Sequence, residues 1–167
     1  MALQEHNRAT AQRRTMQDLR KAFWDTMCEI AQKDKDIIVI TGDLGYSFYE
    51  TYAKKYPFIN AGCAEQSMVG IASGMARMGK KPYVYSGSLF LIGRAYEQVR
   101  DDVAYNNTNV KLVGTGASGF LGFTHNFCNG ENEEDLLKNL PLKRFYPKSK
   151  QELKRALLTK KGAYIRL

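Results

Sequence analysis

The sequence alternates short apolar runs with longer segments that have the residue pattern of helices. The expected strands are 37–41, 58–61, 82–86, 110–116, 143–146 and 163–167. The expected helices precede and separate them, at 16–33, 49–55, 64–78, 91–105, 133–139 and 149–159. In the first of these, Met16, Leu19 and Phe23 recur at helical spacing. Strands that alternate with helices predict a mostly parallel sheet covered on both faces, which is a three-layer α/β/α architecture.

The chain of 167 residues fits one domain. We expect this domain at 16–167, after a polar and basic tail at 1–15. The tail lacks the apolar core of a secretory signal, and no apolar run approaches the roughly 20 residues that span a membrane. These features predict a cytoplasmic protein with no membrane partner.

The net charge of +8 has two interpretations, because a basic surface attracts either nucleic acid or anionic metabolites and acidic partners. The lysines and arginines are scattered, and no basic stripe interleaves with aromatic residues. We therefore expect no nucleic-acid partner. The three cysteines, Cys28, Cys63 and Cys128, are far apart and form neither a disulfide framework nor a metal-binding motif.

Glycine-rich or polar loops follow several of the expected strands. They begin at Gly42, Gly62, Ser86 and Gly114. In a parallel α/β sheet, ligands bind beyond the carboxyl ends of the strands. We therefore expect these loops to gather at one edge and to form the binding site.

Glu65 stands in the first turn of the expected helix at 64–78, which is otherwise apolar on nearly every face. From the residues alone, a carboxylate that complements the helix dipole is the favoured interpretation. The apolar neighbours also suggest a dry site, where a carboxyl group is suited to proton transfer. Such an apolar helix is either buried or in contact with another subunit, and Gly70, Ser73 and Gly74 would permit close approach.

Residues 62–76 have the pattern G-x-A-E-Q-x-M-V-G-I-A-x-G-M-A, and G-x-x-P follows at 79–82. This motif resembles the pyrimidine-binding domain of transketolases. It is also similar to the corresponding part of deoxyxylulose-phosphate synthases and, more distantly, of 2-oxoacid dehydrogenase β-subunits. The similarity extends from about residue 16 to 167, with an interruption near 119–132. It implies a thiamine-diphosphate-binding fold.

The resemblance also implies roles for individual residues. Glu65 matches the glutamate that hydrogen-bonds N1′ of the aminopyrimidine and so activates the cofactor. Phe90 matches a phenylalanine that stacks on the aminopyrimidine, and Asp43 an aspartate at the cofactor and subunit interface. His125 matches a histidine that faces the substrate and moves protons. From the residues alone, Phe90 could be a core residue, and His125 would normally be a loop or core residue. For Asp43, a helix cap or turn residue is an equal alternative.

Three further positions match residues that bind the sugar phosphate in transketolases. They are Arg20, Ser47 and Arg166. Guanidinium groups suit bidentate recognition of phosphate, so the resemblance implies a small anionic, sugar-like substrate.

The sequence departs from the family pattern at several places. A second family phenylalanine, three residues before Phe90, is replaced by Gly87, and a phosphate-facing histidine by Gly116. The acidic pair that precedes His125 in the family is missing, and 116–132 is a rebuilt loop. These departures put ordinary ketose-phosphate specificity in doubt.

The family binds Mg²⁺ and the diphosphate of the cofactor through a Gly-Asp-Gly motif and a downstream asparagine, which the 167 residues lack. We therefore expect no metal ligands in this chain and a separate polypeptide that binds Mg²⁺ and diphosphate. Two copies of each chain would form a heterotetramer, with the helix at 64–78 at the central contact.

The leading hypothesis is a transketolase-like transferase subunit that moves a two-carbon ketol unit between sugar or sugar-phosphate substrates. Arg20, Ser47 and the final Y-I-R-L favour it over a β-type component of a 2-oxoacid decarboxylase or dehydrogenase. A third hypothesis is a non-catalytic assembly subunit. Gly87 and Gly116 support the third hypothesis, whereas Glu65, Phe90 and His125 argue against it.

Overall fold

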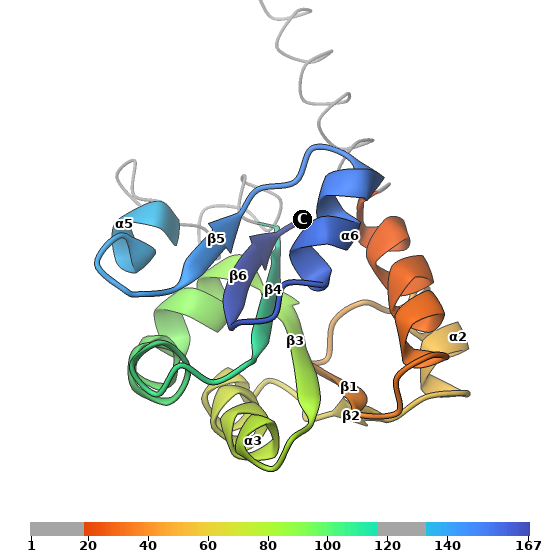
Figure 1. Cartoon of the computed structure of the whole chain (residues 1–167), viewed down its shortest axis with the longest axis horizontal. Helices are drawn as coiled ribbons and strands as arrows, with labels where there is room; N and C mark the ends of the chain where they lie inside the picture. The colour runs from red at the N-terminus through yellow and green to blue at the C-terminus, as the bar shows by residue number, and fades with distance from the viewer. Residues whose placement is uncertain (1–18, 117–132) are drawn as a thin grey trace, which may run out of the picture.

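A computed structural model of the protein describes residues 19–116 and 133–167, so the expected tail at 1–15 lies outside the described residues. The centre of the fold is a six-stranded sheet with the order β2-β1-β3-β4-β6-β5 (Figure 1). All five strand pairs are parallel. The strands are β1 Ile37–Thr41, β2 Phe58–Asn60, β3 Lys81–Gly87, β4 Lys111–Thr115, β5 Lys143–Phe145 and β6 Ala163–Arg166. The predicted strands and the three-layer α/β/α class are thereby confirmed.

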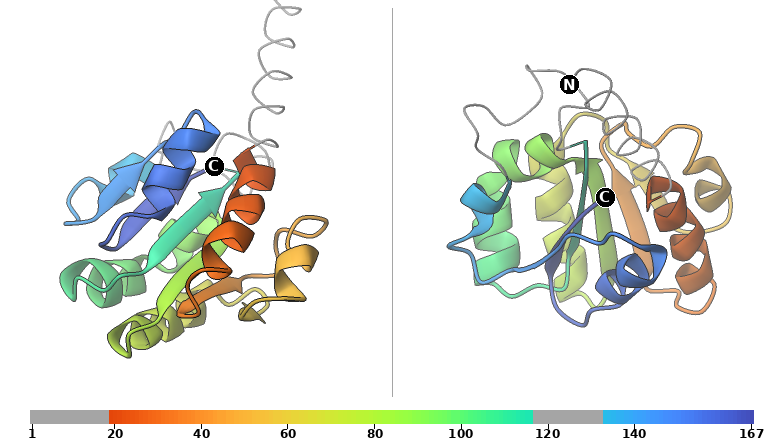
Figure 2. Two further views of the ribbon diagram at one scale, coloured as in Figure 1. Left: turned by 45° about the vertical axis from the view of Figure 1, so that its right-hand side comes forward. Right: turned by 90° about the horizontal axis from the view of Figure 1, so that it is seen from above.

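One face of the sheet is covered by the helical segment 19–31 and by α6 Lys150–Leu157, with the short α2 Glu50–Ala53 beside the β2 edge (Figure 2). Leu19, Phe23 and Met27 point into this core because they recur every four residues. The start of α6 is fixed by Ser149, whose hydroxyl accepts a hydrogen bond from the Glu152 backbone N–H at 3.3 Å.

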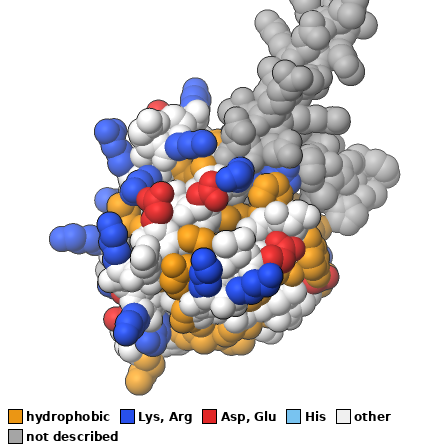
Figure 3. Space-filling view, turned by 90° about the vertical axis from the view of Figure 1, so that its right-hand side faces the viewer, with side chains coloured by type: hydrophobic (Ala, Val, Ile, Leu, Met, Phe, Trp, Pro, Cys, Tyr) orange, Lys and Arg blue, Asp and Glu red, His pale blue; other side chains and the backbone are white. Residues whose placement is uncertain are grey.

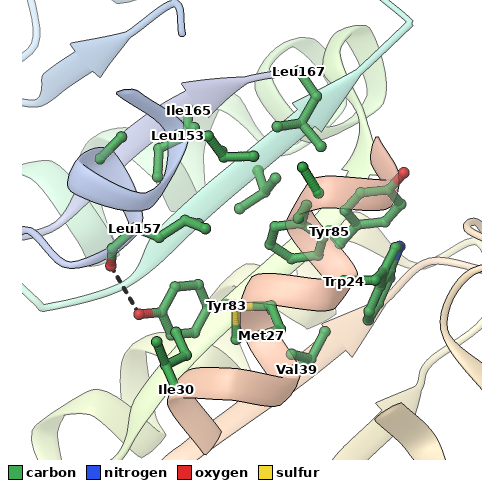
Figure 4. Close-up of a cluster of buried hydrophobic side chains, with 14 of the residues drawn as sticks. Trp24, Met27, Ile30, Val39, Tyr83, Tyr85, Leu153, Leu157, Ile165 and Leu167 are labelled. Atoms are coloured by element: carbon green, nitrogen blue, oxygen red, sulfur yellow. Dashed lines mark hydrogen bonds between the residues drawn. The ribbon is translucent and has the colours of Figure 1, made fainter. Parts of the chain in front are cut away.

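An aromatic cluster fills the middle of this layer (Figure 4). The Phe23 ring stacks on Tyr85 with centroids 5.2 Å apart, and Trp24 contacts Tyr85 at the same distance. Tyr83, on the same strand, donates its hydroxyl proton to the Leu157 carbonyl at 2.8 Å. The buried hydroxyl group is thereby satisfied, and α6 is tied to β3.

The other face is covered by α3 Glu65–Arg77, by the helical segment from Phe90 to Tyr105 and by α5 Glu133–Leu137. A second core lies beneath these elements, and it includes Met68, Val69 and Leu91. Ser73 donates its hydroxyl proton to the Asp102 carbonyl at 2.7 Å, so Ser73 faces the neighbouring helical segment of the same chain. Ser73 is therefore buried within this chain, and the expectation that it lies at a contact with a partner is wrong.

The predicted single helix at 91–105 is divided into three helical segments of two types. The π-helical η1 Phe90–Arg94 and η2 Val99–Tyr105 flank the α-helical α4 Tyr96–Gln98. The wide turns close through bonds five residues apart, such as the Ala95 N–H to the Phe90 carbonyl at 3.3 Å. Wide helical turns of this kind are frequent at functional sites.

Charged side chains of both signs are interspersed on the molecular face shown in Figure 3, without a continuous basic stripe. Two large apolar side chains of α3 and its end are exposed: Ile71 at 48% and Met78 at 85%. The described helices include none that is long and apolar enough to cross a bilayer.

Candidate active site

The carboxyl ends of β1 and β3 place Gly42 and Ser86 beside Glu65. A Cβ atom added to Gly42 would lie 3.2 Å from Glu65 Oε1 and 3.2 Å from Ser86 Oγ. The loops that follow these strands and the beginning of α3 therefore meet at one edge of the sheet, as the sequence predicts for a ligand-binding edge.

Glu65 is the first residue of α3, and only 1% of it is exposed. The Ser86 hydroxyl donates to Oε1 at 2.9 Å, and Arg94 Nη1 donates to Oε2 at 2.8 Å. A buried carboxylate requires such partners, because its transfer out of water is otherwise very unfavourable. The helix N-terminus adds a favourable dipole, and the burial of Glu65 agrees with the dry surroundings that its neighbours suggest, whereas proton transfer by this group stays a prediction.

Phe90 begins η1 and is partly buried, three residues after the end of β3. The guanidinium carbon of Arg94 lies 4.6 Å from the centroid of the Phe90 ring. This distance is within the range of a cation–π contact. Phe90, Arg94 and Glu65 therefore form one continuous group, in which a planar cation bridges an aromatic ring and a buried carboxylate.

Asp43 and Ser47 belong to an exposed loop after β1. Both have left-handed backbone conformations, with φ angles of 57° and 69°, which are uncommon for residues other than glycine. The Asp43 N–H donates to Asn60 Oδ1 at 3.1 Å, and its carboxylate accepts from the Tyr46 hydroxyl and, at 3.2 Å, from Asn60 Nδ2. The hydrogen bonds that the carboxylate accepts, first from Tyr46 and then from Asn60, lower the pKa of Asp43. The loop is fixed in a conformation with local strain, as found at many functional sites.

A pocket of about 220 Å³ lies next to this loop. Its lining comes from the first helix, from the loop after β1 and from the carboxyl ends of β3 and β4: Arg20, Leu44, Gly45, Tyr46, Phe48, Tyr85, Gly87, Thr115 and Gly116. The structure thus brings Arg20 together with the segment that contains Ser47. The Arg20 guanidinium carbon is 5.6 Å from the Phe48 ring centroid.

Arg166 lies at the end of β6, outside the lining of that pocket. Its Nη1 forms an ion pair with Oε1 of Glu133 at 2.9 Å, and its guanidinium carbon is 5.0 Å from the Tyr146 ring centroid. Glu133 is 2% exposed. Arg166 therefore has a structural partner that the sequence did not predict.

His125, predicted as a catalytic and substrate-binding residue, falls outside the described residues. Sequence reasoning gave Arg94 no role and named Ser86 only as the start of a loop, although both donate hydrogen bonds to the Glu65 carboxylate within the described part of the chain. The spacing of four between Phe90 and Arg94 on a helical segment is the one pattern that indicates their contact in advance.

The fold and site define a parallel α/β domain with a buried carboxylate at the carboxyl edge of its sheet. The chain belongs to the transketolase pyrimidine-binding domain family, whose family model, described as "Transketolase, pyrimidine binding domain", matches residues 15–162.

Two curated proteins show the same relationship. The chain is 44% identical over 112 residues to a subunit of the apulose-4-phosphate transketolase of Phocaeicola vulgatus, covering 64% of this chain and 36% of that protein. It is 40% identical over 116 residues to a putative transketolase C-terminal section of Methanocaldococcus jannaschii, covering 66% of this chain and 37% of that protein. The match thus spans little more than a third of either relative.

A solved structure agrees with these relatives. It is described as a split-gene transketolase in an inactive β4 tetramer, and it matches with a TM-score of 0.75 and 31% identity. The match covers 89% of this chain and 50% of that chain. The similarity therefore extends over most of this chain.

Proposed function

We propose that this chain supplies the pyrimidine-binding half of a thiamine-diphosphate-dependent, transketolase-like transferase. The observation that supports this most is the pair of groups at the sheet edge: a buried Glu65 carboxylate and, bridged to it by Arg94, the Phe90 ring. A carboxylate suits a ring nitrogen, and an aromatic face suits a flat heteroaromatic ring. The residues present therefore fit the aminopyrimidine of the cofactor.

In this proposal Glu65 holds a proton at the pyrimidine N1′ position, and Phe90 stacks on the ring. Ser86 orients the carboxylate through its 2.9 Å bond to Oε1. When bound, thiamine diphosphate supplies the nucleophilic carbon that a two-carbon ketol transfer requires. Asp43 follows Gly42, where an added Cβ atom would lie 3.2 Å from Glu65 Oε1, so the strained loop of Asp43 would border the same site.

The substrate is proposed to be a small, anionic, sugar-like molecule bound near Arg20. Arg20 lines the pocket that the loop of Ser47 closes on one side. Arg166 uses its Nη1 atom in the ion pair with Glu133. Its other guanidinium N–H groups would donate hydrogen bonds to the substrate. One relative is named for apulose 4-phosphate, which is consistent with a phosphorylated substrate. His125 remains a proposed proton-transfer residue on the substrate side.

Mg²⁺ and the cofactor diphosphate are proposed to bind mainly to a partner polypeptide, in a heterotetramer with two copies of each chain. The names of the relatives support a divided enzyme, since one is called a transketolase subunit and the other a C-terminal section. The exposed Ile71 and Met78 side chains make the outer face of α3 the proposed contact surface. Large apolar side chains exposed on one face are typical of interaction sites.

The test is turnover of a ketose phosphate by the assembled complex with thiamine diphosphate and Mg²⁺. Glu65→Gln should reduce turnover at least 100-fold, as expected for loss of an acid–base group. The matched control is Glu97→Gln, because Glu97 is an exposed glutamate on the neighbouring helical segment. If Glu65→Gln retains full turnover, the assigned role of Glu65 is wrong. Preferred use of 2-oxoacids over ketose donors would instead identify a decarboxylase or dehydrogenase component.

A further inference from the structure

We infer that Arg94 occupies the place of the cofactor aminopyrimidine in the cofactor-free protein, so that cofactor binding requires the Glu65–Arg94 ion pair to open. This inference rests on the proposed function, since it takes Glu65 and Phe90 as the pyrimidine-binding groups. It assigns to Arg94 a role in the affinity for the cofactor.

The first argument is geometric. A planar guanidinium group lies 4.6 Å from the Phe90 centroid and hydrogen-bonds the Glu65 carboxylate at 2.8 Å. An aminopyrimidine requires the same two partners, a ring to stack on and a carboxylate for its ring nitrogen. Two planar groups do not occupy one aromatic face and one carboxylate oxygen at the same time.

The second argument concerns charge. Glu65 is almost fully buried, and the neutral Ser86 hydroxyl is its other side-chain hydrogen-bond partner among the described residues. Without Arg94, the carboxylate would be left in a low-dielectric site with no countercharge. Arg94 therefore stabilises the ionised carboxylate for as long as the cofactor is absent.

The third argument concerns which group moves. The Arg94 side chain is 46% exposed, whereas the Glu65 side chain is 2% exposed. A long arginine side chain at the solvent boundary can turn outward while its aliphatic part stays on the protein surface. Glu65, at the first residue of α3, is held in place by Ser86 and by packing. Opening of the pair thus moves Arg94 and leaves Glu65 in place.

In this inference Arg94 competes with the cofactor for Glu65 and Phe90. The apparent affinity for the cofactor is then the intrinsic affinity multiplied by the fraction of protein in which the Glu65–Arg94 pair is open. Arg94→Met keeps an unbranched apolar side chain on Phe90 and removes the guanidinium group. We expect this variant to bind thiamine diphosphate about tenfold more tightly. This factor is the change in affinity that the loss of one partly desolvated cation–π contact and its ion pair would cause. Arg94→Lys keeps the charge without the planar group, and should lie between Arg94→Met and the wild-type protein.

The experiment is calorimetric titration of thiamine diphosphate with Mg²⁺ into the assembled complex, without substrate, so that the readout is independent of turnover. The melting temperature of each cofactor-free complex is measured in parallel. Arg100→Met is the matched control, because Arg100 lies on the same helical segment and pairs with its exposed neighbour Asp101 at 2.8 Å. It should leave the affinity unchanged.

Tighter binding by Arg94→Met, together with a lower melting temperature without cofactor, would support the inference. Equal or weaker binding by both Arg94 variants in a wild-type complex that binds the cofactor would overturn it and leave the proposed function intact. No binding by the wild-type complex or by either variant would overturn both. Binding by the variants alone would show that Arg94 blocks the site.

Discussion

Gly87 and Phe90 are packed so closely that a side chain on Gly87 would displace the Phe90 ring. A Cβ atom built on Gly87 would lie 3.0 Å from Cδ2 and 3.4 Å from Cε2 of that ring. The family resemblance places a second phenylalanine at position 87, and the structure shows that Phe90 itself fills the adjoining space. The departure at Gly87 therefore reshapes the site around one aromatic ring, with Leu44 as the next neighbour.

Gly87→Ala tests this packing. The alanine methyl group should shift the edge of the Phe90 ring and weaken thiamine diphosphate binding by the assembled complex about three- to tenfold, which corresponds to roughly 1 kcal/mol. The free energy of unfolding should change little, because Gly87 itself lines the pocket beside Arg20 and the site is not closely packed on that side. Gln151→Ala is the control, because Gln151 is an exposed residue of α6 and lies away from both the candidate site and the proposed contact surface of α3. Unchanged cofactor affinity in Gly87→Ala would show that the ring does not contribute to binding.

The fold was predictable because its determinants are local. Central strands of a parallel sheet are buried on both faces, so they appear as continuous apolar runs such as residues 37–41. The first helix was predictable from its spacing, which places Phe23 and Met27 on one buried face. The wide turns of η1 and η2 were not predictable, because periodicity does not separate a π-helical turn from an α-helical one.

The site was predictable only in part. Glu65 and Phe90 could be named from a motif, but the partners of the carboxylate are 21 and 29 residues away along the chain. Such pairs depend on how the sheet edge assembles. Gly116 illustrates another limit: its φ angle of 78° favours glycine, so the histidine that the family has at this position would be strained here. The glycine in place of the family histidine thus fits a left-handed backbone conformation, which the sequence pattern alone does not indicate.

The Glu133–Arg166 ion pair provides a test of whether Arg166 is structural. Arg166→Met leaves the almost fully buried Glu133 carboxylate without its cation. We expect the free energy of unfolding to fall by about 3 kcal/mol. This value is at the lower end of the range for a broken buried ion pair, because Arg166 is partly exposed. Glu133→Gln should recover part of this loss in the double variant. Denaturant unfolding of the single and double variants measures the coupling.

Arg155→Met is the control for that cycle, since Arg155 is an exposed arginine of α6. It should change the free energy of unfolding by less than about 0.5 kcal/mol. Additive effects of the two substitutions at 133 and 166 would show that the pair contributes nothing. If Arg166→Met instead retains its stability and raises only the KM for a ketose phosphate, Arg166 acts on the substrate alone.

Lys111 predicts a dependence of stability on pH that is separate from the active site. Burial lowers the pKa of this ammonium group from 10.5 to about 8, and Asn109 accepts its hydrogen bond. Between these two values the unfolded chain binds more protons than the folded protein, so the contribution of Lys111 makes stability rise from pH 8 to about 10.5. Below pH 8 the full destabilisation, at most roughly 3 kcal/mol, is present.

Lys111→Met should therefore raise the free energy of unfolding at pH 7 by about 1–3 kcal/mol and remove this contribution to the rise above pH 8. The gain is smaller than the full destabilisation because the Asn109 side chain loses its partner. Lys143→Met is a closely matched control: Lys111 and Lys143 are both aligned with Ala163, on opposite sides of β6, but Lys143 is exposed. Unfolding in urea at pH 7, 8, 9 and 10 should give the wild-type pH profile for Lys143→Met and a flatter one for Lys111→Met. A loss of stability in Lys111→Met at pH 7 would mean that its hydrogen bond outweighs the unfavourable burial of its charge.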